Sequence, residues 1–369
     1  MSENQICVAV VGVRFGAEFV PIYRSHPDVR EVVICDADEE RLRRVGDEFG
    51  VQRRFSDLQA LLSAPDIDAV HLLTPFLLHA KQTLQVLEAG RHCASAVCMG
   101  STLEELARII ETQRATGKNY MMMETAVYSR EYLFVKDLYD RGELGNPTFL
   151  RGTYFQDIEG YPDYWKAVPP MHYATHAIAP LLALTETRAT RVNCLGSGVL
   201  SPHLKTSEES PFRLEAALFR LENPPIAAEV TRSWFETARP YVEGFDVYGS
   251  KKGFEWNQFR GEKPALYTLS EERTSPGRPV LIERVDIPDY AQRLPKPLRK
   301  FTQYETDGAH GGSHPHLVHE FVRSIIEGRS PAIDAVTSAN WTAPGICAHT
   351  SAIQDGETVL IPHFAQVNE

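Results

Sequence analysis

A short apolar run followed at once by a glycine turn limits the fold of the N-terminal third most strongly. Residues 6–11 are apolar enough for one buried strand, and residues 12–17 place Gly12 and Gly16 directly after it. Residues 18–24 then predict a helix. A strand, a tight turn and a helix in this order begin a parallel sheet, and the free backbone N–H groups of such a turn can bind a phosphate.

A second predicted strand, residues 31–36, ends in a carboxylate. Asp36 stands at about the distance expected for the acid that binds a ribose 2′-hydroxyl, and its charge would repel a 2′-phosphate, so NAD is favoured over NADP. The glycine pattern is imperfect, because Arg14 occupies the usual place of the second glycine. An ordinary strand–helix–strand unit without nucleotide is the alternative. The predicted cofactor-binding residues here are Gly12, Arg14, Phe15, Gly16 and Asp36.

The alternation of strands and helices continues to residue 123. It predicts an α/β fold with an N-terminal doubly wound parallel sheet, residues 1–123. Residues 124–369 form the predicted second domain, for substrate binding and oligomerisation. Its runs of alternating polarity predict an α+β domain with an open, mainly antiparallel sheet. The predicted strands are residues 148–155, 190–195, 212–221, 227–234 and 244–248. The proline-rich stretch between Glu255 and Gly308 shows little periodicity and predicts an irregular excursion.

Tyr173 and His176 are the strongest candidates for catalysis. Residues three apart lie on one face of a helical turn, where a phenol and an imidazole can reach one substrate hydroxyl. A phenol with its ordinary pKa of about 10 needs a nearby positive charge to act as a base, whereas an imidazole titrates in the useful range. A structural role is the alternative for both. Glu124, just after a predicted strand, either orients hydroxyls or is a buried carboxylate paired with Arg130 or Arg151.

Several segments together resemble the Gfo/Idh/MocA oxidoreductases, whose N-terminal domain is a Rossmann fold. They include Gly12 to Gly16, Asp36, the pair Thr74-Pro75 with His79, residues 89–92 and residues 142–147. The resemblance covers nearly the whole chain. It implies that Thr74, Pro75 and His79 bind the cofactor, and that the second domain's sheet makes a homo-oligomer, a dimer or tetramer.

One departure from that family is informative. Most members carry a catalytic lysine where this chain has Val97. The branch called glycoside hydrolase family 109 also carries valine there, and segments around Met121, Tyr128, Tyr173 and Gly311 resemble it. That likeness implies a tightly held NAD next to Val97, oxidation of a sugar hydroxyl at C3, elimination of the aglycone, addition of water and return of the hydride. Ala96, Cys98 and Thr125 depart from the branch.

Further polar residues are candidate substrate contacts. For His172, a structural role is about as plausible as a substrate contact. The predicted set is Tyr128, Tyr154, His172, His310 and His314. The histidine-rich segment that begins near Asp307 lacks a carboxylate or thiolate at ordinary ligand spacing, so no metal is predicted. His316 and His319 are expected to cap a helix or to be exposed.

Composition excludes some partners. A net charge of −11 argues against nucleic acid and anionic membranes. The six cysteines are scattered without a CxxC pair, which predicts reduced thiols, with Cys98 in packing rather than as a nucleophile. No apolar run approaches the ~20 residues of a membrane span, so a cytoplasmic protein with a small substrate is expected.

These observations favour an NAD-dependent enzyme that oxidises a sugar or glycoside hydroxyl. An ordinary sugar or polyol dehydrogenase with dissociable NAD is one alternative. A catalytically silent nucleotide or sugar sensor is the other.

Overall fold

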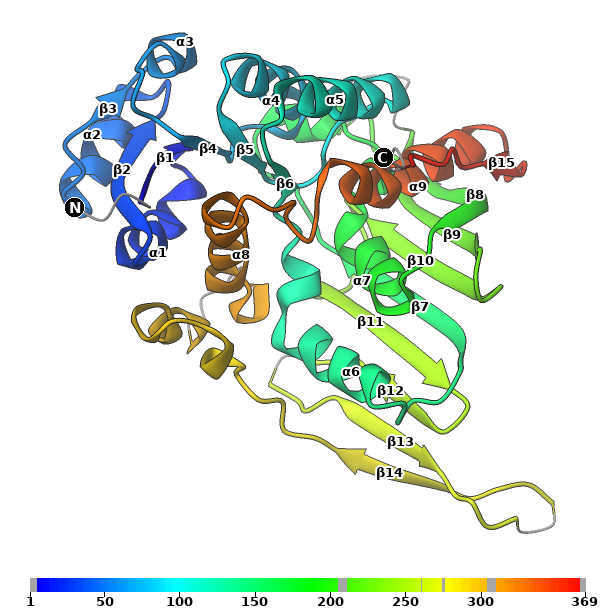
Figure 1. Cartoon of the computed structure of the whole chain (residues 1–369). Coiled ribbons are helices and arrows are strands. Elements are labelled where there is room, and N and C mark those ends of the chain that lie inside the picture. Colours follow the sequence, from blue (N-terminus) through cyan, green and yellow to red (C-terminus); the bar gives the residue numbers. More distant parts are fainter. Residues whose placement is uncertain (1–4, 205–210, 260, 274–275, 304–309, 366–369) are drawn as a thin grey trace. The chain divides into compact units, whose positions relative to one another are not determined.

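A computed structural model describes residues 5–204, 211–259, 261–273, 276–303 and 310–365 (Figure 1). The chain forms two compact units. Unit 1 contains residues 1–128, 289–339 and 364–369, and unit 2 contains residues 129–288 and 340–363. The division at residue 123, as a statement about domains, stays a prediction. Helix α9, Ala335–Ile353, runs through the boundary between the units.

Unit 1 is built on a six-stranded parallel sheet with the order β3-β2-β1-β4-β5-β6. The order reverses between β1 and β4, and ligands bind at such a point in doubly wound sheets. The N-terminal part of the predicted fold class is therefore confirmed. The strands are β1 Ile6–Val11, β2 Val29–Cys35, β3 Arg54–Phe55, β4 Ala69–Leu72, β5 His92–Ser95 and β6 Tyr120–Met122.

Three helices of unit 1, α2, α3 and α5, begin after a residue whose side chain caps them. Thr102 and Glu105 form a capping box at the start of α5, and Gly117, with φ +64°, ends that helix. The helix expected at residues 18–24 is different: a 3₁₀ turn at Gly16–Glu18 comes first, and α1 begins only at Val20, next to Pro21. The helices are α1 Val20–Ser25, α2 Glu39–Glu48, α3 Leu58–Leu62, α4 His79–Glu88, α5 Leu103–Thr116 and α8 His314–Ile326.

Unit 2 contains a nine-stranded open sheet with the order β14-β13-β12-β11-β7-β10-β9-β8-β15. Only the β7–β10 pair is parallel, so the sheet is mainly antiparallel, as predicted. The strands are β7 Pro147–Phe155, β8 Ala189–Val199, β9 Phe212–Leu221, β10 Ala227–Ser233, β11 Val242–Gly249, β12 Lys252–Glu255, β13 Ala265–Leu269, β14 Val280–Arg284 and β15 Val359–Leu360.

The two faces of this sheet differ. Side chains of β9 alternate between buried and exposed along the strand, which is typical of a sheet with one covered face. Helix α7, Thr175–Thr185, packs closely on β7, because a Cβ at Gly152 would come within 2.1 Å of the Ala177 carbonyl oxygen. Helix α6, Arg130–Asp140, also belongs to this unit.

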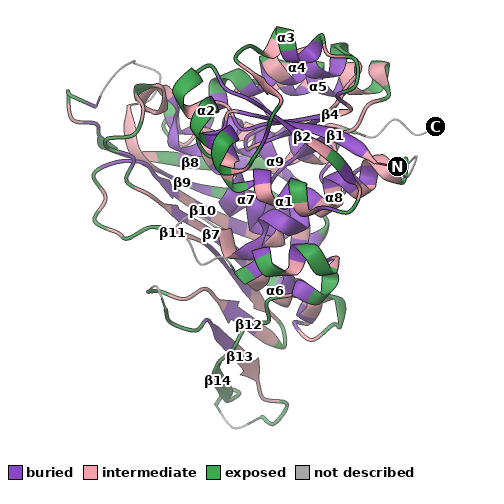
Figure 2. Cartoon of the chain, turned by 90° about the vertical axis from the view of Figure 1, so that its left-hand side faces the viewer, coloured by how far each residue is buried: buried purple, intermediate pink, exposed green. Residues whose placement is uncertain are grey.

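The irregular excursion expected after Glu255 is partly wrong. Strands β13 and β14 pair there as a hairpin, and all five residues of β14 are exposed (Figure 2). The apolar residues 280–282 have a high preference for strands, and the prolines lie outside the paired segments. Short 3₁₀ helices at Ala291–Arg293 and Lys296–Gln303 follow. Residues 304–309, which include Asp307 and Gly308, lie outside the described residues.

Candidate functional site

The glycine turn of unit 1 has a shape that only glycine permits at its first position. Gly12 has φ +87°, and a Cβ there would lie 2.6 Å from the Leu73 carbonyl oxygen. Gly16 packs under the turn, where a Cβ would lie 3.0 Å from a methyl of Val10. Within the described ranges, the backbone N–H groups of Arg14 and Phe15 have no protein acceptor. The turn can therefore present them to a diphosphate.

Asp36 follows β2 and is almost fully buried. Its Oδ2 accepts a hydrogen bond from Val13 N at 2.8 Å, and its Oδ1 accepts one from Asp38 N at 2.9 Å. The Arg41 Nη1 lies 3.0 and 3.2 Å from the two carboxylate oxygens. The carboxylate is thus fixed beside the glycine turn, where the ribose of a dinucleotide needs it. Turn and acid together fit NAD, and Arg41 is a neighbour that the sequence interpretation missed.

His79 lies in the same unit, but its ring is engaged within the protein. Nδ1 lies 2.9 Å from the Cys98 carbonyl oxygen and Nε2 lies 2.9 Å from the Thr74 carbonyl oxygen. Burial lowers the pKa of His79. The side chain therefore ties together the segments that follow β4 and β5. Thr74 and Pro75 are half-buried and Val97 is buried; their contacts with a cofactor stay a prediction.

His310 and His314 stand beside the glycine turn. Their ring centroids lie 6.1 and 5.8 Å from that of Phe15. His314 begins α8, and its Nδ1 lies 3.5 Å from Glu18 Oε2. Unit 1 therefore brings both histidines to the predicted cofactor site, while their role as sugar contacts stays a prediction.

The expectation for His316 is wrong. His316 belongs to α8, and its side chain is buried. Its ring lies nearly parallel to that of Tyr128, with 6.4 Å between the centroids. Burial lowers the pKa of His316 to about 4. His319 is half-buried, and its Nδ1 lies 3.0 Å from His26 Nε2. Neither side chain caps the helix or is exposed, because both face packed parts of unit 1.

Glu124 is fully buried just after β6. Its Oε1 accepts a hydrogen bond from Ala126 N at 3.0 Å. Arg151, one of the alternative partners considered for it, has Nε 3.6 Å from Glu229 and Nη1 3.7 Å from Asp246 within unit 2. The role of Glu124 in orienting hydroxyls or relaying a proton stays a prediction.

Tyr173 and His176 are neighbours, but they do not share one helical turn. Tyr173 ends a 3₁₀ turn, Pro170–Tyr173, and His176 is the second residue of α7. Ala174, with φ −110° and ψ 9°, separates the two elements. Two prolines at 169 and 170 fix the backbone of the first turn, so it is distinct from the helix. The rings still lie 5.8 Å apart between centroids, at 76°.

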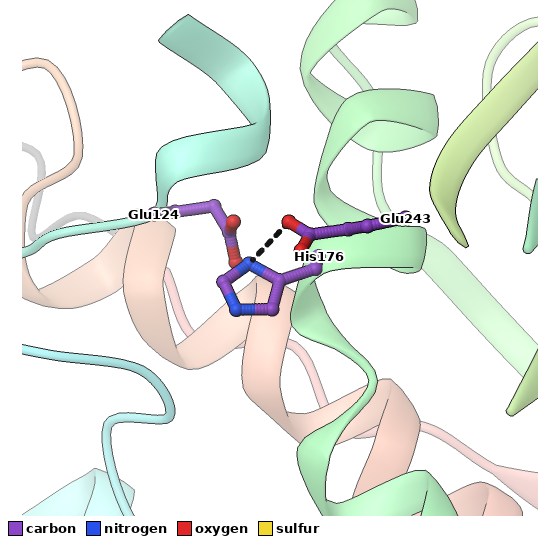
Figure 3. Close-up of side chains that lie close together, drawn as sticks. All are labelled: Glu124, His176 and Glu243. Carbon is purple, nitrogen blue, oxygen red and sulfur yellow. Dashed lines mark ion pairs between the residues drawn. The ribbon is translucent and has the colours of Figure 1, made fainter. Parts of the chain in front are cut away.

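His176 lies within hydrogen-bond distance of Glu243, a partner that the sequence interpretation missed. His176 Nδ1 lies 3.2 Å from Glu243 Oε1, and the two side chains are 5% and 9% exposed (Figure 3). Tyr241 donates its hydroxyl proton to the other oxygen, Oε2. A carboxylate at Nδ1 favours the tautomer in which Nε2 accepts a proton. In the sequence, Glu243 was visible only as a single acid just before the predicted strand at residues 244–248, and in the structure it lies within β11.

An aromatic group surrounds this pair within unit 2. The Tyr154 ring centroid lies 5.5 Å from that of His176, and the Tyr154 hydroxyl donates to Gln156 Oε1 at 2.9 Å. Burial raises the pKa of Tyr154. His172 packs on His349, with 5.1 Å between ring centroids, and burial lowers the pKa of His172 to about 3. Tyr154 therefore lies with Tyr173 and His176, whereas His172 contacts a different helix.

Comparison with known proteins finds two family models that match different parts of the chain. Residues 6–124 match the model of an oxidoreductase family with an NAD-binding Rossmann fold, and residues 231–368 match the model of the glycosyl hydrolase 109 C-terminal domain. An α-N-acetylgalactosaminidase of Shewanella oneidensis is 24% identical over 90% of this chain and 79% of its own length. A glycosyl hydrolase family 109 protein of Saccharopolyspora erythraea is 21% identical over 99% and 84%.

Solved structures share the fold. Levoglucosan dehydrogenase in complex with NADH and levoglucosan superposes with a TM-score of 0.78, at 19% identity, over 97% of this chain and 100% of that one. For myo-inositol 2-dehydrogenase of Lactobacillus plantarum the TM-score is 0.73, at 16% identity, over 97% and 100%.

The fold and the cofactor turn define an NAD-dependent oxidoreductase. Its first third matches the NAD-binding domain of the Gfo/Idh/MocA oxidoreductases, and its C-terminal part is similar to that of glycosyl hydrolase family 109. In the described part of the chain, no helix has the length and apolar character needed to cross a membrane.

Proposed function

We propose that this protein uses NAD to oxidise the C3 hydroxyl of a glycoside and then cleaves the glycosidic bond through the ketone. The observation that carries the proposal is the buried His176–Glu243 pair next to Tyr173, in a chain with valine at position 97. These side chains offer a proton acceptor to a chain that has Val97 in place of the usual lysine. An α-N-acetylgalactosaminide is the first substrate to test, because one relative carries that activity in its name.

The chain's own groups divide the proton transfers. The glycine turn and Asp36 would hold NAD, which would accept a hydride from C3 and later return it. His176, oriented by Glu243, accepts the proton of the C3 hydroxyl through Nε2. The ketone acidifies the hydrogen at C2, and Tyr173 removes it as a proton. The electron pair left at C2 forms the C1–C2 double bond, and the aglycone oxygen departs from C1 with its electrons.

Water then completes the cycle. Its oxygen adds to C1, a proton returns to C2 from Tyr173, and the proton that the water loses balances the one that the departing aglycone oxygen takes up. As the cofactor would return its hydride to C3, His176 gives its proton back to the C3 oxygen. No oxidant is consumed, so the reaction sums to hydrolysis of the glycoside.

Two substitutions and a solvent isotope test this proposal. Tyr173→Phe and His176→Ala should each lower turnover by about 100-fold or more while NAD stays bound. Tyr267→Phe, on β13 of the same sheet, serves as the matched control and should retain activity. In D₂O the product should carry deuterium at C2. Near-normal turnover in both variants would contradict the assignment.

We further propose a homo-oligomer, a dimer or tetramer. The uncovered face of the open sheet has apolar side chains that are more than half exposed: Leu195, Val199, Leu218 and Leu360. Burial of such a face against a second copy would remove apolar area from water. Light scattering would measure the mass, and a monomer at micromolar concentration would contradict the proposal. On the sequence grounds above, the proposed location is the cytoplasm.

A further inference from the structure

Unit 2 buries an arginine without a carboxylate partner. Arg232, in β10, is fully buried. Its guanidinium carbon lies 3.5 Å from the ring centroid of Tyr154 and 3.6 Å from that of Trp234. In the residues that the structure describes, no carboxylate lies within ion-pair distance of it. Burying a cation in this way costs several kcal/mol, so the position calls for a functional reason.

The guanidinium donates to backbone carbonyls from three segments. Nε donates to the Tyr173 carbonyl at 3.2 Å, and Nη1 donates to the Tyr154 carbonyl at 3.4 Å and to the Ser233 carbonyl. Nη2 lies 3.5 Å from Gln156 Oε1. The planar guanidinium group of Arg232 therefore connects β7 and β10 with the turn that carries Tyr173. A single ammonium group lacks the planar geometry to make these contacts together.

Arg232 also provides a positive charge among groups that ionise. Burial lowers the pKa of Arg232 to about 10, and Tyr154, Tyr241, Tyr173 and Glu243 act in the opposite direction. The side chain therefore remains charged at neutral pH. The ring of Tyr173 lies near His176 of α7 and near Trp165 and Trp234, which do not ionise, and its carbonyl accepts from Arg232 of β10. Glu243 of β11 and Tyr154 of β7 lie beside His176.

We propose that Arg232 is a positioning residue of the sugar-oxidising site, which holds the Tyr173 turn through its backbone carbonyl and favours the ionised phenol. The proposal rests on the function proposed above. The sequence interpretation required a positive charge near Tyr173, and Arg232 supplies one from the protein itself. The charge is permanent at neutral pH, in contrast to that of a histidine.

Two substitutions separate placement from charge. Arg232→Lys keeps the charge but loses the fork, so kcat should fall about 10-fold or more with little change in KM. Arg232→Met removes the charge. Arg220→Lys, on the exposed side of β9, is the matched control and should behave as the wild type.

An ultraviolet titration reads the phenol without any turnover. The tyrosinate spectrum of the wild type minus that of Tyr173→Phe isolates Tyr173, and the same difference is taken in the Arg232→Met background. We expect the midpoint to move up by about one pH unit or more when the arginine is absent. An unchanged midpoint in a folded Arg232→Met protein would overturn the charge role.

If Arg232→Met does not fold, the lysine variant decides, and an unaltered kcat in Arg232→Lys would overturn the positioning role. A wild-type protein that cleaves no glycoside would instead contradict the proposed function, and the titration would still report on Arg232.

Discussion

The glycine turn of unit 1 and the polar cluster of unit 2 place opposite demands on their side chains. In the turn, the proposed cofactor binding uses backbone N–H groups and the missing Cβ of Gly12, while Arg14 is exposed. In the cluster, His176, Glu243 and Arg232 are buried and held by specific polar atoms. Cofactor binding at the turn should therefore tolerate changes of side-chain chemistry but no added volume at Gly12. Catalysis at the cluster should be lost even when a substitution conserves side-chain volume.

The largest expected effect is at the turn. Gly12→Ala adds a Cβ against the Leu73 carbonyl at a positive φ, and backbone strain of roughly 3 kcal/mol weakens binding by about 100-fold or more. Calorimetric titration with NADH measures it. Gly90→Ala is the control, because Gly90 also has positive φ but a Cβ there meets nothing within 4 Å. Equal NADH affinity in Gly12→Ala and wild type would refute the role of the turn.

The next largest effect is expected from a substitution in the cluster that conserves side-chain volume. Glu243→Gln keeps the shape but removes the charge that orients His176, so kcat should fall by about 10-fold or more with NADH affinity unchanged. Steady-state kinetics with the glycoside gives both parameters. Glu229→Gln, on exposed β10 surface, is the control. A Glu243→Gln enzyme as fast as the control would remove Glu243 from the account.

A smaller effect concerns cofactor choice. Arg41 partly neutralises Asp36 and would contact a 2′-phosphate. Arg41→Ala should therefore weaken the binding of NADPH relative to that of NADH by about 5-fold. The ratio of the two dissociation constants is the readout, with exposed Arg43→Ala as the control. A ratio that does not change, or that changes in favour of NADPH, would mean that Arg41 does not act on the ribose end.

Acid should affect the two units differently. In unit 1 burial lowers the pKa of His26, His92 and His316 to about 4 and that of His71 to about 3. In unit 2 burial lowers the pKa of one histidine, His172, to about 3 and raises that of Asp246 to about 6. The histidines give stability that is complete above pH 6.5 and is lost as pH falls toward 4. The buried Asp246 has the opposite sign, because its folded form holds the proton more tightly.

Hydrogen exchange at pH 6 and pH 5 should therefore show greater loss of protection in unit 1 than in unit 2. His316→Gln should reduce the loss in unit 1 by about 1 kcal/mol over this interval. His203→Gln, at an exposed position, should not. Equal losses in both units would contradict the larger number of buried neutral histidines assigned to unit 1.

The two regions also differ in what the sequence allowed us to predict. The parallel sheet, the turn at Gly12 and the acid Asp36 follow from residues that are close in the chain, because strand, turn and helix signals are local. The strands of unit 2 followed from alternating polarity in the same way. The hairpin β13–β14 was missed because proline and charge around it hid two short strands.

The partners of His176 could not be predicted from local signals. Glu243 and Arg232 come from strands more than fifty residues away, and only the sheet brings them beside Tyr173 and His176. For Arg232, the available signal was a charged residue inside the predicted strand at residues 227–234. The separation of Tyr173 from α7 also depends on local backbone geometry at Ala174, which the three-residue spacing did not reveal.

The most direct test of the central claim uses the purified protein without added cofactor. The protein is denatured and released NAD is quantified, while a panel of glycosides, led by an α-N-acetylgalactosaminide, is assayed with and without external NAD. The account predicts stoichiometric bound NAD and glycoside cleavage that ignores added cofactor. An empty protein that forms NADH only when NAD and a sugar are supplied would contradict it and establish an ordinary dehydrogenase. Binding without any turnover would contradict it in favour of a sensor.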